Sequence, residues 1–407
     1  MGLCRTGEPA EMHCLDLAPS PPGRNAPPGE MMEDRNIMAA RDLMAEFAAL
    51  TGLDPPQTRP RRYLWTDAYA VCNYLELFCR TGDRTFRDLA LRLVHQVHHT
   101  LGRHRDDDSR TGWISGLSDE GAEAHPTRGG LRIGKPLPER RPDEPFDERL
   151  EWERDGQYYH YLTKWMHALN RVGRITADPT YIRWAVELAQ AAHAAFTYVP
   201  PAGGRKRMYW KMSIDLSYPL VPAMGQHDPL DGLVTYSELE VTAGEINLSA
   251  EIAEMARISR GQGLFTDDPL GIGGLLFDAG RMAQLLSRGG FACEDLLAPV
   301  LDAALTGLAA FTRGGTLRHP ADYRLAFREL GLSIGLRGTG ELVRHLRENS
   351  GLSGRADALM RYVPLADAIE RFWMDARNRE AGTWTGNREI NMVMLATSLA
   401  PEEFLKV

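Results

Sequence analysis

The chain lacks both a surplus of basic residues and an ordered set of cysteines. Its formal net charge is -8 over 407 residues, so it does not offer the clustered positive surface that a nucleic-acid backbone requires. Its cysteines are odd in number and have no metal-ligand spacing, at Cys4, Cys14, Cys72, Cys79 and Cys293. We therefore expect no nucleic-acid partner and no disulfide framework. A reducing compartment fits this pattern best, and we expect the protein to be cytoplasmic.

Long apolar runs and cofactor motifs are also missing from the sequence. No run approaches the roughly 20 apolar residues of a membrane helix, and the first residues lack the apolar core of a signal peptide. The sequence has no glycine-rich phosphate loop after a strand and no nucleophile elbow. His95 and His99 can share a helical face, but no carboxylate follows them at ligand spacing. We expect no membrane partner, no cofactor and no metal.

The composition predicts one large globular domain behind a short leader. Hydrophobic residues make up 43% of the chain and charged residues 25%, which is ordinary for a protein with a large core. Residues 1–30 are rich in Pro, Gly and Glu, and they carry too little apolar surface to offset the entropy lost on ordering. We interpret 1–30 as a disordered leader, or as an upstream extension of a chain whose natural start is Met31 or Met32, and 31–407 as a single domain.

Short and long connections alternate between helical segments along nearly the whole domain. The short links contain helix caps and breakers, as in Thr81-Gly82-Asp83, Ala177-Asp178-Pro179 and His227-Asp228-Pro229. The long connections include the loop 102–154, and loops of that length are usually functional. The predicted hairpins pair 63–78 with 86–101, 157–172 with 181–196, 211–224 with 238–258, 270–286 with 295–311, 323–336 with a broken return ending in 365–376, and 387–399 with 34–50.

The first helix of each predicted hairpin is more apolar, or richer in small residues, than the second. The run from Gly271 to Gly274 is an example, and glycines let neighbouring helices approach closely. This difference predicts an all-α fold, an (α/α)6 toroid of about twelve helices with six parallel inner helices and six outer ones. The alternative is an open superhelix of helical hairpins, but no fixed period repeats along the chain.

Two segments at predicted inner-helix starts carry a resemblance to known enzymes. They are Trp65-Thr66-Asp67-Ala68-Tyr69 and Tyr158-Tyr159-His160-Tyr161. Together with the helical layout, they make the chain from about residue 34 onward resemble the six-hairpin glycosidase-like superfamily. That superfamily includes glucoamylase-type hydrolases, unsaturated glucuronyl hydrolases and the N-acylglucosamine 2-epimerase group. The resemblance implies a carbohydrate substrate and a pocket where the long loops meet the N-terminal ends of the inner helices.

Carboxylates near the predicted inner-helix starts are the candidates for catalysis. Glycosyl transfer to water usually needs two of them, one protonated and one ionised. The candidates are Asp67, Asp155, Asp215, Asp322 and Glu389. Asp67 and Asp215 lie in apolar stretches, where an unpaired acid is costly to bury, so we predict them as the catalytic pair facing one cavity. Each acid could instead only complement a helix dipole, and if both pair with arginines the acid role passes to Glu389, to Asp322 or to no residue.

Aromatic, amide and basic residues in the same regions predict the saccharide-binding surface. Aromatic faces stack on sugar rings, amides and imidazoles bind hydroxyl groups, and guanidinium groups bind carboxylates. The alternative for each residue is ordinary core packing or solvated surface charge. The predicted binding residues are Trp65, Asp155, Gln157, Tyr158, His160, Arg207, Trp210, His319, Arg324, Trp384, Asn387 and Glu389. Basic groups such as Arg59, Arg61 and Arg62 suit a small anionic ligand better than DNA.

These residues predict a glycoside hydrolase that acts on a short saccharide, acidic or neutral. Two alternatives stay open. A sugar 2-epimerase of the same fold would move a proton beside a carbonyl with paired histidines, for which His160 and His319 are the pair predicted at the mouth. A non-catalytic toroid would bind a saccharide or a partner protein. The sequence is also compatible with a homodimer.

Overall fold

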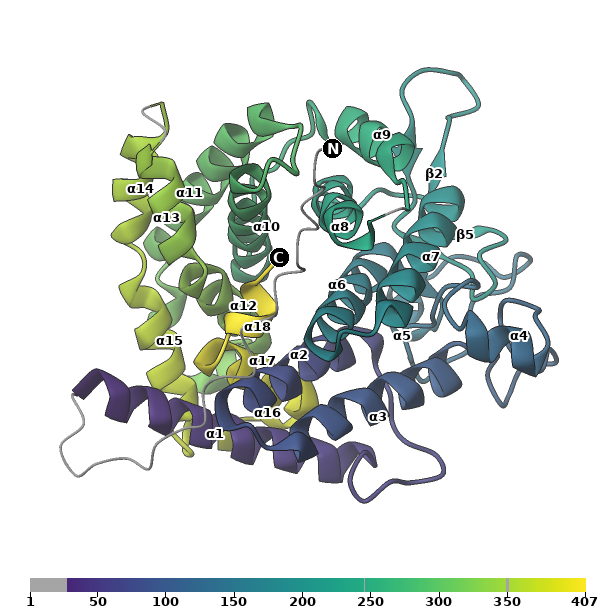
Figure 1. Ribbon diagram of the computed structural model, residues 1–407, viewed down its shortest axis with the longest axis horizontal. Helices are drawn as coiled ribbons and strands as arrows, with labels where there is room; N and C mark the ends of the chain where they lie inside the picture. Colours follow the sequence, from purple (N-terminus) through teal and green to yellow (C-terminus); the bar gives the residue numbers. More distant parts are fainter. Residues whose placement is uncertain (1–27, 245, 349–350) are drawn as a thin grey trace, which may run out of the picture.

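The computed structural model describes residues 28–244, 246–348 and 351–407, which form a ring of helices in two layers (Figure 1). The inner layer consists of α2 (Leu64–Thr81), α6 (Tyr159–Thr176), α8 (Asp228–Ala243), α10 (Pro269–Ser287), α12 (Ala326–Arg337) and α17 (Arg388–Leu399). Each inner helix packs against its two neighbours in this order, and α17 packs against α2. The ring is therefore closed, which confirms the predicted (α/α)6 toroid and excludes the open superhelix.

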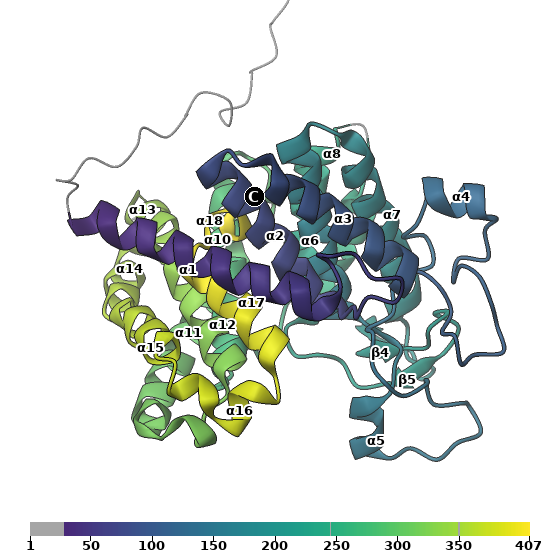
Figure 2. The ribbon, with the colours of Figure 1, turned by 90° about the horizontal axis from the view of Figure 1, so that it is seen from below.

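The outer layer covers this ring with one helical segment for each inner helix. It consists of α1 (Pro28–Thr51), α3 (Arg84–Leu101), α7 (Pro179–Phe196), α9 (Ser249–Ser259), α11 (Leu297–Gly314) and the series α13 (Thr339–Glu348), α14 (Ser353–Met360) and α15 (Pro364–Met374), which shares one position. Helix α1 packs along α17, although the two lie near opposite ends of the chain (Figure 2). This pairing was the predicted closure of the ring, between 34–50 and 387–399, and it is confirmed.

Local sequence signals set most of the helix ends. Asp83 caps α3 by accepting a hydrogen bond of 2.9 Å from the backbone N–H of Thr85, and Asp178 caps α7 in the same way just before its first-turn proline. Gly82 ends α2 with a left-handed φ of 70°, which glycine adopts without strain. Helix α1 begins at Pro28, and residues 1–27 of the predicted leader 1–30 lie outside the described residues.

Glycines bring α10 and α12 into direct backbone contact. A β-carbon on Gly273 would lie 2.1 Å from the carbonyl oxygen of Gly331, and one on Gly335 would lie 2.5 Å from the carbonyl oxygen of Gly273. No side chain fits between the two helices at this point. Gly274, the next residue, has open space around its β-carbon position, so only one face of α10 requires glycine here.

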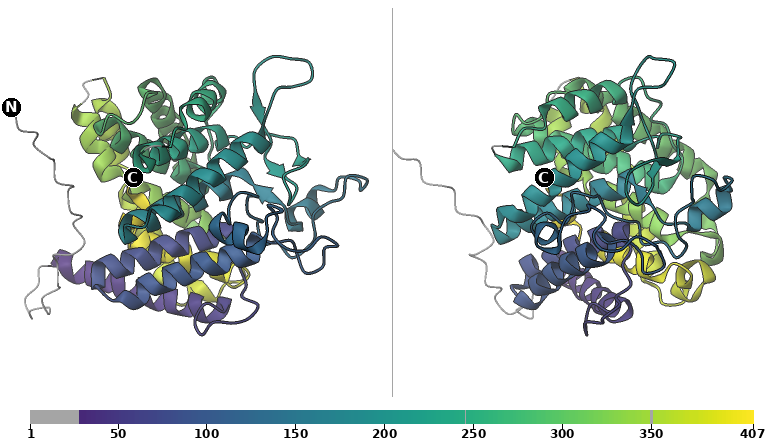
Figure 3. Two further views of the ribbon diagram at one scale, coloured as in Figure 1. Left: turned by 45° about the vertical axis from the view of Figure 1, so that its right-hand side comes forward. Right: turned by 90° about the vertical axis from the view of Figure 1, so that its right-hand side faces the viewer.

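The segments that precede the inner helices gather on one side of the ring and touch one another (Figure 3). Arg140 donates a hydrogen bond of 2.8 Å to the carbonyl of Leu220, and Gln226 donates one of 2.6 Å to the carbonyl of Phe265. These segments contain the short elements α4 (Asp119–Ala124), α5 (Glu148–Glu153), β1 (Gln157–Tyr158), β2 (Thr197–Tyr198), β3 (Arg207–Met208), β4 (Lys211–Met212), β5 (Pro219–Val221), η2 (Thr316–Arg318), η3 (Ala321–Tyr323), η4 (Asn378–Glu380) and α16 (Gly382–Thr385). The loops therefore form a shared rim around the mouth of the ring.

The third hairpin differs from the prediction. Residues 211–224, predicted as an inner helix, instead supply β4 and β5 of a small antiparallel sheet in the order β1-β4-β5, and the inner helix is α8. Pro219 and Pro222 disfavour a helix there, and Leu216 adopts a left-handed φ of 61° in the turn between the strands. Asp228-Pro229 thus begins an inner helix rather than linking two helices, which brings Asp228 to the mouth of the ring.

The last described helix, α18 (Glu402–Leu405), enters the middle of the ring and packs on α2, α6 and α10 (Figure 1). The ring of Phe404 stacks on Tyr69 with centroids 4.3 Å apart and on Phe277 with centroids 4.5 Å apart. The carbonyl of Phe404 lies 2.9 Å from the Nε2 atom of His167. This aromatic group closes the ring opposite its mouth.

One stretch, Glu294–Arg318, is long and apolar enough by composition to cross a membrane, with a mean hydropathy of 1.4. It was not singled out in the sequence, where no such run was expected. The stretch includes the 3-10 turn η1 (Glu294–Leu296) and α11, whose apolar face packs against α10. Helices that pack on a protein core meet the same test of length and composition, so this feature is weak support for a membrane location.

Candidate active site

Two cavities open near the N-terminal ends of the inner helices. The central cavity has a volume of about 340 Å³ and lies among α2, α6, α8, α10 and α12; its walls include Trp65, His160, Trp210, Asp228, Asp268 and Phe404. The lateral cavity has a volume of about 440 Å³ and lies between α1, α2, α3 and α17. The two cavities share no lining residue. Both volumes fall in the range of small-molecule sites.

Aromatic rings form much of the wall of the central cavity. Trp65 lies against Tyr69 with ring centroids 4.7 Å apart, and both project from the first turns of α2. On the other side, the ring of Tyr158 stacks on His160 and contacts Trp210, with centroid distances of 5.4 and 5.0 Å. Flat apolar faces with polar edges are suited to bind a sugar ring, whose faces are apolar and whose rim carries hydroxyl groups.

Asp228 is the buried acid of the central cavity. Its residue surface is only 6% exposed, and its Oδ1 atom lies 3.7 Å from Nδ1 of His160. Neither its Oδ2 atom nor Nδ1 of His160 makes a hydrogen bond within the described part of the chain. Burial, together with the nearby charge of Asp231, raises the pKa of Asp228 to about 8. The carboxyl therefore keeps its proton near neutral pH and has a free polar atom to offer a ligand.

His160 complements this acid without carrying a charge. Burial, with a smaller effect of the Lys164 ammonium, lowers the pKa of His160 to about 4, so its ring is neutral near pH 7. A neutral imidazole both donates and accepts a hydrogen bond. The pair of Asp228 and His160 can therefore bind a hydroxyl or a glycosidic oxygen.

A buried ionic network lies directly beneath Asp228. Asp231, one helical turn further along α8, receives Lys164 and Arg281, each at 2.8 Å. These cations hold the pKa of Asp231 well below its usual range in spite of burial, so two neighbouring acids have opposite protonation states. Arg281 also contacts Asp278 at 2.6 Å and Glu238 at 3.2 Å. The network fixes the first turns of α8 relative to α6 and α10.

Asp268 supplies a second carboxyl group to the same cavity. It accepts a hydrogen bond of 3.1 Å from the backbone N–H of Gly271 and thereby caps α10. Its other oxygen receives Arg328 at 2.6 Å. A carboxylate has about four acceptor positions, so these two partners leave room for a ligand or a water molecule. The central cavity thus contains one carboxyl group with a raised pKa, Asp228, and a second one paired with an arginine, Asp268; glycosyl transfer to water uses two carboxyl groups.

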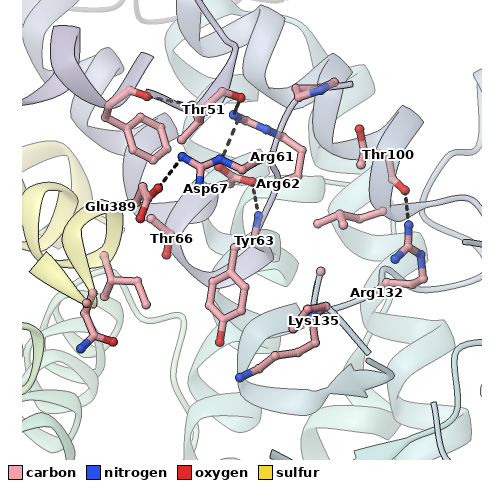
Figure 4. A pocket seen from close by; sticks show the side chains of 18 residues that line it. Thr51, Arg61, Arg62, Tyr63, Thr66, Asp67, Thr100, Arg132, Lys135 and Glu389 are labelled. Atoms are coloured by element: carbon pink, nitrogen blue, oxygen red, sulfur yellow. Dashed lines mark hydrogen bonds and ion pairs between the residues drawn. The ribbon is translucent and has the colours of Figure 1, made fainter. Parts of the chain in front are cut away.

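Asp67, predicted as catalytic, lies in the lateral cavity (Figure 4). Its Oδ1 atom receives Arg62 at 3.2 Å, and its Oδ2 atom receives the backbone N–H of Tyr63 at 2.9 Å. Burial raises the pKa of Asp67 to about 6 against the opposing effect of Arg62. Both carboxylate oxygens of Asp67 thus accept hydrogen bonds from residues just before α2. Asp67 therefore has fewer free acceptor positions for a ligand than Asp228. Asn387 and Glu389 line the same lateral cavity, and Glu389 pairs with Arg61 at 2.6 Å.

Asp215, the other predicted catalytic acid, lies in the turn after β4 and lines neither cavity. It accepts hydrogen bonds from the side chains of Ser213 and Ser217, and Arg110 pairs with it at 2.8 Å. Burial would raise its pKa, but these hydrogen bonds and Arg110 lower it below the usual range. The structure therefore does not bring Asp67 and Asp215 to one cavity, and it pairs each of them with an arginine. The alternative carboxyl, Asp322, accepts a hydrogen bond of 3.2 Å from the N–H of Gly382.

Three of the predicted binding residues, Trp65, His160 and Trp210, meet in the central cavity, with Tyr158 packed behind them. The others have different surroundings. Asp155 is buried between Arg132 and Arg105, Gln157 bonds to loop backbone, Arg324 is buried against Glu329, and Trp384 is buried against Trp373. Arg207 and His319 are exposed and line neither cavity, so the two histidines of the epimerase alternative are not brought together.

Sequence reasoning missed the acids Asp228 and Asp268. Both stand immediately before a proline at the start of an inner helix, as Asp228-Pro229 and Asp268-Pro269. The Asp-Pro pair is a helix-start signal, and its repetition before two inner helices was the clue available in the sequence. Within the described residues, no group of three or more His, Cys, Asp or Glu side chains is placed to hold a metal ion.

Similarity to known proteins lies in the fold. No protein-family model matches the chain, and a comparison with curated proteins finds no match. Among solved structures, a GH76 alpha-mannanase of Bacteroides thetaiotaomicron is 10% identical, with a TM-score of 0.52 over 92% of this chain and 99% of the mannanase. A GH76A alpha-1,6-mannanase of a Salegentibacter species is 11% identical, with a TM-score of 0.50 over 90% of this chain and 99% of that one. The chain thus shares the (α/α)6 toroid fold of these two mannanases.

Proposed function

We propose that the protein is a carbohydrate-active enzyme, a glycoside hydrolase that acts on a short saccharide in the central cavity. The observation that carries the proposal is the buried carboxyl of Asp228, which lines an aromatic cavity and whose Oδ2 atom has no partner within the described residues. Its raised pKa agrees with the role of an acid. A buried polar atom without a partner is costly unless a ligand or water satisfies it. The fold shared with two mannanases supports the same substrate class.

The proposed reaction uses the two carboxyl groups of the central cavity. Asp228 donates its proton to the glycosidic oxygen while the bond from that oxygen to the anomeric carbon breaks. A water molecule attacks the anomeric carbon, and Asp268 accepts the proton that the water loses. Exchange with solvent then restores the proton on Asp228 and removes it from Asp268. Trp65 and Trp210 hold the sugar ring in place during these steps.

The test combines ligand binding with turnover. A panel of short neutral and acidic saccharides is screened for thermal stabilisation, since a ligand that binds the native state raises its stability. Saccharides that stabilise the protein are then assayed for release of reducing ends. Asp228→Asn should abolish turnover and keep the stabilisation, because the amide has a similar shape but no acidic proton. Asp268→Asn should behave in the same way.

The same assay decides between this assignment and its rivals. The pair Asp67 and Asp215 stays a prediction from the sequence, and Asp67→Asn or Asp215→Asn would abolish turnover only if that prediction holds. Full turnover by Asp228→Asn would exclude Asp228 as the acid. Stabilisation by saccharides without turnover of any of them would instead favour the non-catalytic binding toroid.

A further inference from the structure

The lateral cavity is separated from the central cavity by a pair of tyrosines. The hydroxyl groups of Tyr63 and Tyr161 lie 2.6 Å apart, and Tyr161 packs on the central-cavity side against Trp65 with ring centroids 6.4 Å apart. Tyr63 faces the lateral cavity, where it lies among the labelled side chains of Figure 4. The lateral cavity thus has lining residues of its own and shares none with the central cavity.

The charges that line the lateral cavity do not balance. Four cationic side chains line it, Arg61, Arg62, Arg132 and Lys135, against the two carboxylates Asp67 and Glu389. Each arginine is matched: Arg61 pairs with Glu389 at 2.6 Å, Arg62 with Asp67 at 3.2 Å, and Arg132 with buried Asp155 at 2.6 Å.

Lys135 is the cation that remains. Its ammonium group forms no ion pair or hydrogen bond with any part of the chain that the structure describes, and it lies 5.7 Å from the ring centre of Tyr63. The acids that act on it electrostatically, Asp155 and Glu153, lie beyond ion-pair distance. A partly buried ammonium without a carboxylate partner favours the binding of one negative charge.

Two buried polar atoms in the same wall also lack partners. Thr66 is only 2% exposed, and its hydroxyl oxygen makes no hydrogen bond within residues 28–244, 246–348 and 351–407. The same holds for Nε of Arg62, whose side chain is fully buried. Both residues line the lateral cavity, so a ligand oxygen there would satisfy donors that the protein leaves unused.

Much of the remaining wall is apolar, although Thr51, Thr100 and Asn387 also line the cavity. Phe47 of α1, Leu101 of α3 and Ile390 of α17 line the cavity together with Pro60 and Pro136. A fully polar anion such as phosphate would leave these side chains without contacts. A single negative charge on an apolar body matches both the surplus ammonium and the apolar wall.

We propose that the lateral cavity is a second ligand site that takes a small monocarboxylate with an apolar body. Lys135 binds the carboxylate, the hydroxyl of Thr66 and Nε of Arg62 supply further donors, and Phe47 and Ile390 contact the apolar body. The site is separate from the proposed hydrolysis of saccharides, and it needs neither Asp228 nor Asp268.

Binding of 2-naphthoate to the full-length protein tests the proposal, with 2-naphthamide as the uncharged probe of the same shape. Calorimetry and thermal shift should detect the naphthoate and not the amide. Lys135→Met keeps the length of the side chain and should weaken naphthoate binding by about tenfold or more, because it removes the one cation of the cavity lining that has no ion-pair partner among the described residues. Thr66→Val, which preserves shape, should weaken binding by a smaller factor.

Two controls make the result decisive. Lys206→Met removes a lysine that pairs with Glu254 outside the cavity, and it should leave naphthoate binding unchanged. Asp228→Asn should also leave it unchanged, so failure of one site cannot be mistaken for failure of the other. Equal affinity of Lys135→Met and the unaltered protein, each with a cooperative melting transition, would overturn the proposal. Equal binding of the amide and the carboxylate would overturn it as well.

Discussion

Replacing Asp228 by Asn should change how the stability of the protein depends on pH. The carboxyl of Asp228 has a pKa of about 8 in the folded protein, whereas an aspartate in an unfolded chain has a pKa of about 3.9. Below pH ~4 the Asp228 carboxyl is protonated in both the folded protein and the unfolded chain, so its contribution to stability does not change with pH there. As the pH rises toward 8, the unfolded chain loses the proton while the folded protein keeps it, so stability falls. Above 8 the folded protein also ionises and the fall ends.

The magnitude follows from the difference between the two pKa values. At about 1.36 kcal/mol for each pKa unit, a difference of about four corresponds to about 5 kcal/mol lost between pH ~4 and pH ~8. The Asn side chain has no proton to lose, so the variant lacks this contribution. The free energy of unfolding of Asp228→Asn, measured relative to the unaltered protein, should therefore rise steadily with pH in this range.

Equilibrium urea unfolding at about pH 5, 6 and 7 measures this difference directly. Asp215→Asn is the matched control, because the lowered pKa of Asp215 contributes stability that is present above pH ~4 and lost only as the pH falls further. Its difference from the unaltered protein should be constant over the same range. A difference for Asp228→Asn that is equally constant would show that Asp228 ionises normally in the folded protein and would remove the basis for its role as an acid.

Gly273→Ala should lower the free energy of unfolding by about 1–3 kcal/mol, because the added β-carbon would meet the Gly331 backbone at 2.1 Å. At Gly274 the β-carbon position has open space, so Gly274→Ala should raise the free energy of unfolding by up to about 1 kcal/mol. Urea unfolding of both variants measures these changes, and similar effects of the two substitutions would contradict the close packing of α10 on α12. Phe404→Ala should cost about 3–5 kcal/mol in the same assay, because it empties a buried aromatic stack. Arg281→Met should lower the free energy of unfolding by about 3–5 kcal/mol, because three buried carboxylates lose a shared partner. Thermal unfolding near neutral pH measures this loss, and an unchanged melting temperature would show that the network contributes little to stability.

The hairpins were predictable from the sequence because their signals are local. Caps such as Asp83 and Asp178 and the helix-ending Gly82 act within one turn, and the corresponding helices begin and end within a few residues of the prediction. The error at 211–224 arose where a short apolar run fits a strand as well as a helix. Pro219 and Pro222 were local evidence against a helix, whereas the pairing of β4 with β1, which sets the strand, is a long-range contact.

The candidate site was only partly predictable for the same reason. Trp65, His160 and Trp210 were identified because dense aromatic runs near helix starts are visible in the sequence, and they meet in the central cavity. Asp228 was not identified, because its role depends on whether α8 runs inside or outside the ring. The protonation state of an acid depends on burial and on neighbours distant in the sequence, such as Lys164 beside Asp231, and no local pattern encodes it.

The floor that Phe404 provides makes the ring a cup rather than a tube. A substrate therefore enters the central cavity from the loop side, and its product leaves by the same route. The product has to leave before the next substrate can bind beside Asp228. A long saccharide chain cannot thread through the ring from end to end. Only a short molecule, or one end of a longer chain, can be seated against Trp65 and Trp210.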